Sequence, residues 1–430
     1  MQSATSSVSL KLLRKQILER KGGSAFVKGK ALSNSTVNNT EEFVLQICKR
    51  TCLSMWACNN PFAEQGKELC DVLVVCDPHI LIISVKDVIL HVDKERAGFD
   101  RWERKAVDAS VKQIYGAERS LANAAKVRFK DGSHGLNLPA LTDRKIHRIA
   151  VAFGSSGQVP IKSGDFGKGF VHVMNERSFF ELLSELDTIS DLVDYLAAKE
   201  DYSFRCALVV EGSEANLLGW YLFHNRSFPG GADVTVVDDT IWSQIREKPE
   251  WKRRKEADGV SYAWDKLIEM LSDPKAKSVS GPQPQLTDLE LALRSMARET
   301  RFSRRVLGQA VGEFLAEAKA RNLRSRAMLS PSGVIYVLVY FNSSDALQNR
   351  PPELALRCVA AREKVGKGDI VVGIGIGEHE PGKGSTSDLA YLQPEDWPQF
   401  ILQSESALRA SGFFLEGPVR HSHHQEYPKC

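Results

Sequence analysis

The sequence has no hydrophobic run long enough to cross a membrane and no large excess of charge of either sign. Its longest apolar stretches, residues 80–85 and 371–376, are far shorter than the ~20 residues that a membrane-spanning helix needs. The start of the chain carries scattered charges and no continuous apolar segment, so we expect no signal peptide. Lys and Arg number 57 and Asp and Glu 54, which excludes a uniformly basic surface but leaves room for local basic faces. These absences predict a cytoplasmic protein that does not bind membranes.

Several common chemical motifs are also missing or incomplete. The eight cysteines lack the paired spacing of a disulfide framework, so we expect reduced thiols. Neither the zinc motif HExxH nor the nucleophile motif GxSxG occurs. Residues 377–384 nearly fit a phosphate-binding loop, but Gly384 stands where Ser or Thr would bind Mg²⁺. The glycine-rich stretch 373–384 leaves an unrelated small-molecule enzyme open as one alternative.

The length and composition of the chain predict a globular protein of two or three domains. Its 430 residues exceed the usual size of one domain, and its hydrophobic content of 43% is ordinary for a folded protein. Residues 273–287 are rich in Pro, Ser and Gly, which is typical of a linker. We divide the chain into an N-terminal extension (1–37), two α/β segments (38–155 and 156–272), the linker (273–287), a C-terminal α/β domain with a basic helix (288–419) and a loose polar tail (420–430).

Helical and strand-like patterns alternate along these segments. Thr40, followed by Glu41, Glu42 and an apolar run, is typical of a helix start. Two strand-like runs come next, joined tightly by residues 77–79. This alternation predicts an α/β fold. The predicted strands cover residues 69–76, 80–85, 146–153, 169–174, 206–211, 334–341 and 370–376, and the predicted helices cover 101–125 (interrupted by Gly116), 177–196, 289–319 and 353–363.

An acidic residue and a lysine mark the ends of the first two strand-like runs. Asp71 opens one buried strand, and Lys86 closes the next, which is otherwise apolar. If the strands pair as a hairpin, both residues lie at the same open end of the sheet, because the turn is at the other end. Ser84 and Lys86 are two residues apart, so they point to the same face. A lysine on a buried strand needs a carboxylate or a bound anion to offset its desolvation.

Such a pair suits the hydrolysis of phosphodiesters. A carboxylate can hold a divalent metal that polarises the phosphate, and a lysine can activate the attacking water. With Glu-Leu-Cys-Asp at 68–71 and Ser-x-Lys at 84–86, residues 41–153 resemble the PD-(D/E)xK nuclease superfamily. The resemblance implies an αβββαβ core like that of restriction endonucleases, followed here by further α/β segments.

The resemblance also implies roles for individual residues. By position, Asp71 and Glu41 would bind Mg²⁺ or Mn²⁺, and Lys86 would be the catalytic lysine. Gln113, in the helix after the hairpin, would be the polar residue beside the site. The implied substrate is nucleic acid, DNA more than RNA. A nuclease fused to further α/β segments would suit a setting such as antiviral host defence or DNA processing.

Position 84 departs from the family pattern, which requires Glu, Asp or Gln where this chain has Ser84. A hydroxyl is a weak ligand for Mg²⁺. Either Glu41 replaces the missing carboxylate in space, or the domain has lost catalysis and serves as a scaffold that binds nucleic acid or protein. We expect the later segments to contact the substrate, to form a homo-oligomer or to bind a partner protein.

A row of arginines follows the predicted linker. Arg294, Arg298, Arg301 and Arg305 are spaced by four, three and four residues, which aligns them on one stripe of a single helix. Between positions 294 and 326 nine Lys and Arg stand against three Glu. The stripe predicts a surface that binds nucleic-acid phosphates. The alternatives are a solvated helix face, or a face that docks on an acidic surface of another domain.

Overall fold

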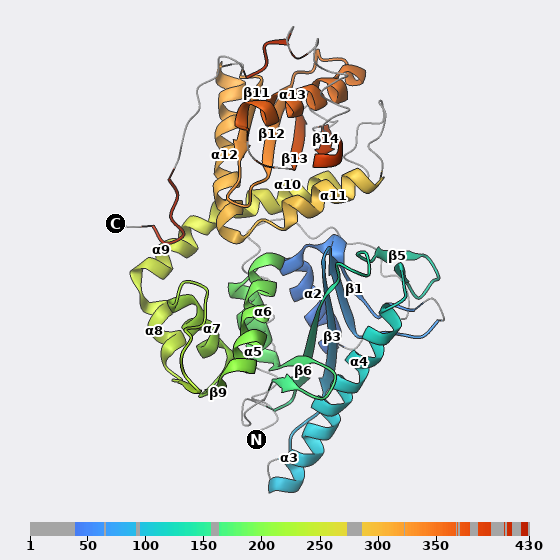
Figure 1. The fold of residues 1–430 in the computed structure, drawn as a ribbon, viewed down its shortest axis with the longest axis vertical. Coiled ribbons are helices and arrows are strands. Elements are labelled where there is room, and N and C mark those ends of the chain that lie inside the picture. Colours follow the sequence, from blue (N-terminus) through green and yellow to red (C-terminus); the bar gives the residue numbers. More distant parts are fainter. Residues whose placement is uncertain are drawn as a thin grey trace.

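The computed structural model describes residues 39–63, 66–91, 95–155, 163–272, 286–321, 323–366, 368, 370–378, 386–396, 408, 411–414 and 423–428. It is a mixed α/β structure with two main sheets, as Figure 1 shows. The predicted N-terminal extension (1–37) and most of the predicted linker (273–285) lie outside the described residues. No helix in the described part of the chain combines the length and the apolar character needed to cross a bilayer.

The first sheet contains six strands in the order β1-β2-β3-β6-β8-β7. The first three strands are antiparallel, whereas β6 and β8 run parallel to β3. The carboxyl ends of β3, β6 and β8 therefore meet at one edge of the sheet. The bounds are β1 Ala57–Asn59, β2 Val72–Cys76, β3 His79–Asp87, β6 Lys145–Phe153, β7 Gly164–Asp165 and β8 Phe170–Asn175.

Helices cover both faces of this sheet, which explains why β2 reads as a continuous apolar run. On one face, α4 (Ala109–Leu121) packs against β3 and β6. It follows α3 (Glu95–Glu103) and a π-helical turn (Arg104–Asp108). On the other face, α2 (Asn39–Cys52) and α5 (Glu176–Glu185) pack against β2, β3 and β6. A small hairpin of β4 (Lys126–Arg128) and β5 (His134–Asn137) connects α4 to β6.

Several predicted boundaries need correction in this region. The helical irregularity expected at Gly116 lies instead in the π-helical turn at 104–108, and Gly116 is inside α4. The helix predicted for 177–196 is two helices, α5 and α6 (Ile189–Arg205), because the side chain of Thr188 caps a new helix by accepting from Asp191 N. Strand β8 pairs with β6, so the boundary predicted after residue 155 falls inside a continuous sheet.

A smaller unit follows the first sheet. It contains a two-stranded parallel sheet, β9 with β10, and short helices that lead toward the second main sheet. Its elements are β9 Ala207–Val210, α7 Glu214–Phe223, β10 Val234–Val237, α8 Ile241–Glu247, α9 Pro249–Ala257 and α10 Tyr262–Ser272.

The second main sheet has the order β11-β12-β13-β14. Helix α13 (Arg350–Val365) covers one face, and α10, α11 (Leu286–Ala297) and α12 (Arg301–Arg321) cover the other. The single helix predicted for 289–319 is therefore two helices, α11 and α12. The strands are β11 Ser325–Leu329, β12 Ile335–Phe341, β13 Val371–Gly377 and β14 Ser387–Leu392.

One hydrophobic cluster joins the two main sheets. It runs from the α2 face of the first sheet through α5 and α6 to α10, α11 and α12, and then to β12. Trp264 of α10 lies at the second sheet, where its ring meets Tyr336 edge to face at 4.9 Å and its Nε1 donates to Met296 O at 3.2 Å. The first and second sheets therefore share one hydrophobic core.

The tail (420–430) is predicted to be loose, but the part of it that the structure describes, residues 423–428, is held by ion pairs. Glu426 pairs there with Arg226 and Arg254, which fixes these residues beside α9 (Figure 1).

Candidate functional site

Asp71 and Lys86 meet at the open end of the β2–β3 hairpin. Asp71 directly precedes β2, and Lys86 is the next-to-last residue of β3. The turn at Asp77 and Pro78 closes the opposite end of the hairpin. Lys86 Nζ lies 3.2 Å from Asp71 Oδ2, with 29% of the Lys86 side chain and 7% of the Asp71 side chain exposed. The carboxylate supplies the compensation that a half-buried lysine requires.

Gln113 of α4 binds both members of this pair. Its Nε2 donates to Asp71 Oδ1 at 3.1 Å, and its Oε1 accepts from Lys86 Nζ at 2.6 Å. The amide therefore fixes the two charged groups relative to each other from the helix that covers this face of the sheet.

Ser84 is fully buried and points to the same face as Lys86. Its Oγ lies 2.8 Å from Gln113 Oε1 and 3.1 Å from Asp71 Oδ2. A hydroxyl has one hydrogen, so Ser84 donates to one of these oxygens at a time. The backbone N–H of Val85 also donates to Asp71 Oδ2, at 2.5 Å. Ser84 thus acts as a hydrogen-bond donor, whereas the Glu, Asp or Gln of the PD-(D/E)xK pattern would be an acceptor at this position.

Glu41, in the first turn of α2, belongs to the same electrostatic environment. Burial raises the pKa of its carboxyl, and the charge of Asp71 raises it further. Lys86 and a hydrogen bond from the side chain of Asn60 lower this pKa, but by less. The net effect is a glutamate whose pKa lies above its ordinary value. The N-terminal end of α2 therefore brings a second carboxylate to the edge of the sheet that carries Asp71.

The oxygen donors here match the chemistry of a hard divalent cation. Asp71 and Glu41 supply carboxylates, and Mg²⁺ commonly takes one or two carboxylates and keeps several waters. The amide oxygen of Gln113 already accepts from Lys86 and Ser84. Within the residues that the structure describes, no cluster of three or more His, Cys, Asp or Glu side chains is arranged to hold a metal. Both oxygens of Asp71 accept hydrogen bonds, which a cation would partly replace. The residues fit a cation held by two carboxylates and water.

Of the four residues singled out from the sequence, the structure brings Asp71, Lys86 and Gln113 into direct contact, and the fourth, Glu41, lies near enough for Asp71 and Lys86 to shift its pKa. Sequence reasoning missed Asn60 and the backbone amide of Val85. Asn59-Asn60-Pro61 is a typical turn sequence, but nothing in it indicates a contact between Asn60 and Glu41.

The nucleic-acid-binding stripe predicted after the linker is wrong for Arg294, Arg301 and Arg305, which are buried and ion-paired. Arg294 Nη1 lies 3.0 Å from Asp77 Oδ2. Arg301 pairs with Asp187 at 2.8 Å and with Asp265 at 2.9 Å, and Arg305 pairs with Asp258 at 3.2 Å.

The reason is that these arginines face other parts of the protein. Arg298 is half-buried and lies between α11 and α12, so the four residues do not share one helix. These contacts agree with the alternative in which the arginines dock on acidic residues elsewhere in the protein. Asp187 precedes α6, and Asp258 and Asp265 lie in the region of α10.

The other sequence expectations concern parts away from this edge. Cys48, Cys358 and the other described cysteines are buried and free, and burial raises the pKa of the Cys48 thiol to about 12. Residues 379–385 of the glycine-rich loop lie outside the described residues.

Comparisons with protein-family models, with curated proteins and with solved structures found no match to this chain.

Proposed function

We propose that this chain is a metal-dependent nuclease of the PD-(D/E)xK type, with DNA as its more favoured substrate. The observation that carries the proposal is the contact of Lys86 with Asp71, bridged by Gln113, at the open end of a buried hairpin. The succession of α2, β1, β2, β3, α4 and β6, with α3, β4 and β5 as additional elements between them, supports the αβββαβ core that the resemblance implies.

The residues at this edge have separate tasks in such a reaction. Asp71 and Glu41 would hold Mg²⁺ or Mn²⁺, which when bound supplies a Lewis acid for the scissile phosphate. Lys86 would orient and activate the attacking water and offset the negative charge that develops on the phosphate. Gln113 would position Lys86 through the 2.6 Å hydrogen bond to its ammonium group.

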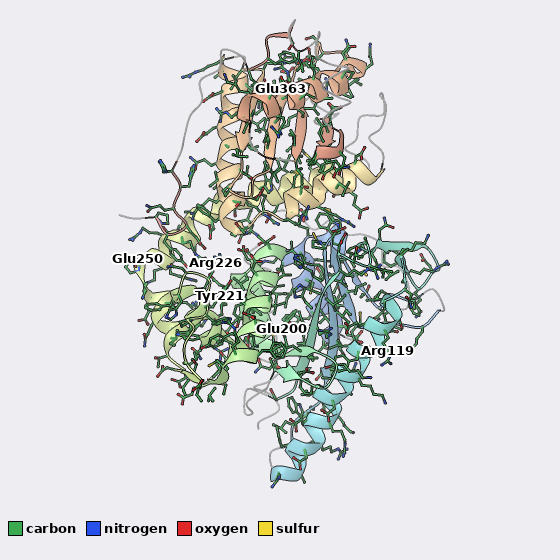
Figure 2. All side chains as sticks on the ribbon, viewed as in Figure 1. Arg119, Glu200, Tyr221, Arg226, Glu250 and Glu363 are labelled. Atoms are coloured by element: carbon green, nitrogen blue, oxygen red, sulfur yellow. The ribbon has the colours of Figure 1, made fainter. Side chains whose placement is uncertain are left out.

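A basic surface on the helix that carries Gln113 supports a polyanionic substrate. Along α3, the π-helical turn and α4, which follow one another without a break, six cations are exposed. Among the described side chains of these elements the exposed acids are three: Asp100, Glu103 and Asp108. None of these cations forms an ion pair with another residue in the described ranges, in contrast to Arg294 and Arg301. They are free to pair with phosphates, and we call them the α3–α4 basic surface; Arg119 is labelled in Figure 2. Its exposed cations are Arg96, Arg101, Arg104, Lys105, Lys112 and Arg119.

A second candidate function is a nuclease-like scaffold that binds nucleic acid or protein without cutting it. The observation in its favour is that Ser84 donates a hydrogen bond where the PD-(D/E)xK pattern has a metal ligand, while both oxygens of Asp71 already accept hydrogen bonds. Such an arrangement is stable without a cation.

One experiment separates the two candidates. Supercoiled, linear and single-stranded DNA and RNA would be incubated with the protein in Mg²⁺, Mn²⁺ or EDTA, beside Asp71→Ala and Lys86→Ala. Metal-dependent cleavage that both substitutions abolish supports the nuclease. Binding without cleavage in every condition, unchanged by the two substitutions, would reject it and favour the scaffold.

A further inference from the structure

Four arginines from three separate parts of the fold surround residues 425–428. We call Arg226, Arg253, Arg254 and Arg305 the arginine cluster. Arg226 follows α7, Arg253 and Arg254 lie on α9, and Arg305 lies on α12. Figure 2 labels Arg226 and Glu250, which lie in this part of the molecule.

The carboxylate of Glu426 is the centre of these contacts. Its Oε1 accepts from Arg226 Nη2 at 2.8 Å, from Arg226 Nε at 3.1 Å and from Arg254 Nη1 at 3.3 Å. Burial raises the pKa of Glu426, but Arg226 and Arg254 outweigh it and hold the pKa below its ordinary value. Charge-assisted hydrogen bonds from two guanidinium groups to one carboxylate are strong and directional.

The cluster also contacts the backbone and the ring beside Glu426. Arg305 Nη2 donates to Gln425 O at 2.6 Å and to Glu426 O at 3.1 Å, and Arg253 Nε donates to Pro428 O at 3.2 Å. The guanidinium carbon of Arg254 lies 5.4 Å from the centroid of the Tyr427 ring, within the range of a cation–π interaction. A carboxylate, an aromatic ring and three carbonyl oxygens are therefore recognised within four residues.

The carboxylate of Glu426 compensates charge in the arginine cluster. It is an ion-pair partner of both Arg226 and Arg254. Only 3% of the Arg254 side chain is exposed, so removing Glu426 would take one counter-charge away from a buried cation.

We propose that the arginine cluster is a peptide-binding site for a short acidic–aromatic sequence, with residues 425–428 of this chain as its bound ligand. The groups that the arginine cluster contacts lie in one short continuous segment. Its recognition depends on groups within Gln425, Glu426, Tyr427 and Pro428, and a quarter of the Glu426 side chain remains exposed to solvent. The same sequence supplied on another molecule would make the same contacts. This inference is independent of the proposed nuclease activity.

The test uses the full chain with a charge reversal, Glu426→Lys, which places a cation against the arginine cluster and displaces the attached segment. A fluorescent peptide of residues 421–430 is titrated into this chain and into the wild type, and anisotropy is recorded. We expect saturable binding to the Glu426→Lys chain and at least about tenfold weaker binding to the wild type, where the attached segment competes at high effective concentration. A peptide that carries Glu426→Gln should bind about tenfold more weakly than the natural peptide, because it loses the charge-assisted bonds.

A second variant covers the case in which Glu426→Lys does not fold. Tyr427→Ala in the full chain removes the ring beside Arg254 without adding a charge, and it should also bind the peptide more tightly than the wild type does. Circular dichroism identifies which chains are folded. The proposal is overturned if no folded variant binds the peptide more tightly than the wild type, or if the Glu426→Gln peptide binds as well as the natural one.

Discussion

Lys86 Nζ lies 3.2 Å from Asp71 Oδ2 although fifteen residues separate the two in sequence, because β2 and β3 form a hairpin whose turn is at the opposite end. Gln113 completes this contact from α4. The arrangement places the cation and the carboxylate proposed for catalysis on a rigid hairpin.

Replacing the lysine tests its proposed role in catalysis. Lys86→Ala should lower the rate of metal-dependent DNA cleavage by about 100-fold or more, the usual loss when a group that transfers or orients a proton is removed. Initial rates on supercoiled DNA measure the change. Lys319→Ala, which removes an exposed lysine on α12, is the matched control and should cleave like the wild type. Equal rates in Lys86→Ala and Lys319→Ala would contradict the role of Lys86.

Introducing an acidic residue at position 84 tests the cation site. Ser84→Asp puts a second carboxylate within reach of Asp71, so we expect a lower melting temperature than that of the wild type in EDTA. Mn²⁺ should raise the melting temperature of Ser84→Asp more than that of the wild type, because the cation offsets the repulsion between the carboxylates. Ser84→Asn is the uncharged control. An equal effect of Mn²⁺ on all three proteins would argue against a cation at this edge.

Glu41→Gln should make the protein more stable at neutral pH in the absence of metal. The pKa of Glu41 is raised in the folded state, chiefly by burial and then by Asp71. A carboxyl with a raised pKa favours folding below its unfolded pKa and loses this contribution as the pH rises through the folded value. Urea denaturation at pH 7 should show a larger free energy of unfolding for Glu41→Gln, and the difference should disappear near pH 3. A less stable variant at pH 7 would show that the electrostatic cause is wrong.

The α3–α4 basic surface should contribute to DNA affinity. In a Lys86→Ala background that prevents cleavage, the combined change Lys105→Glu, Lys112→Glu and Arg119→Glu should weaken binding and reduce its dependence on salt. Fluorescence anisotropy at several salt concentrations gives both quantities. The control is Lys319→Glu with Arg321→Glu, which reverses exposed charges on α12. Equal losses in the two proteins would mean that DNA does not follow α3 and α4.

The buried arginines should affect stability and leave DNA affinity unchanged. Arg301→Ala removes the arginine partner of the buried Asp187, whereas Asp265 keeps its ion pair with Arg304, so we expect a loss of roughly 3–5 kcal/mol in the free energy of unfolding. Arg321→Ala, at an exposed position, should change it by much less. Urea denaturation compares the two variants. A small effect of Arg301→Ala would show that its ion pairs contribute little.

The sequence predicted contacts that depend on short-range geometry. The proximity of Asp71 and Lys86 follows from strand alternation and one tight turn, which are both visible in the residues themselves. The strand boundaries of β3 and β6 follow from their apolar runs for the same reason.

Contacts between distant segments could not be predicted in this way. The spacing of Arg294, Arg301 and Arg305 indicates a shared face but cannot tell whether that face meets solvent or another part of the protein. Likewise Glu426 lies 200 residues from Arg226, and no local pattern links them. The break between α11 and α12 at residues 298–300 also has no glycine or proline to mark it.

The hydrophobic cluster shared by both sheets makes the candidate site dependent on parts of the chain that never touch it. The α2 face behind Asp71 is continuous with α10, α11, α12 and β12. A fragment of residues 38–155 would expose much of this apolar surface to water, so it should aggregate and not fold as an autonomous unit. A substitution near Trp264 would then lower activity by lowering the amount of folded protein while leaving the turnover of each folded molecule unchanged.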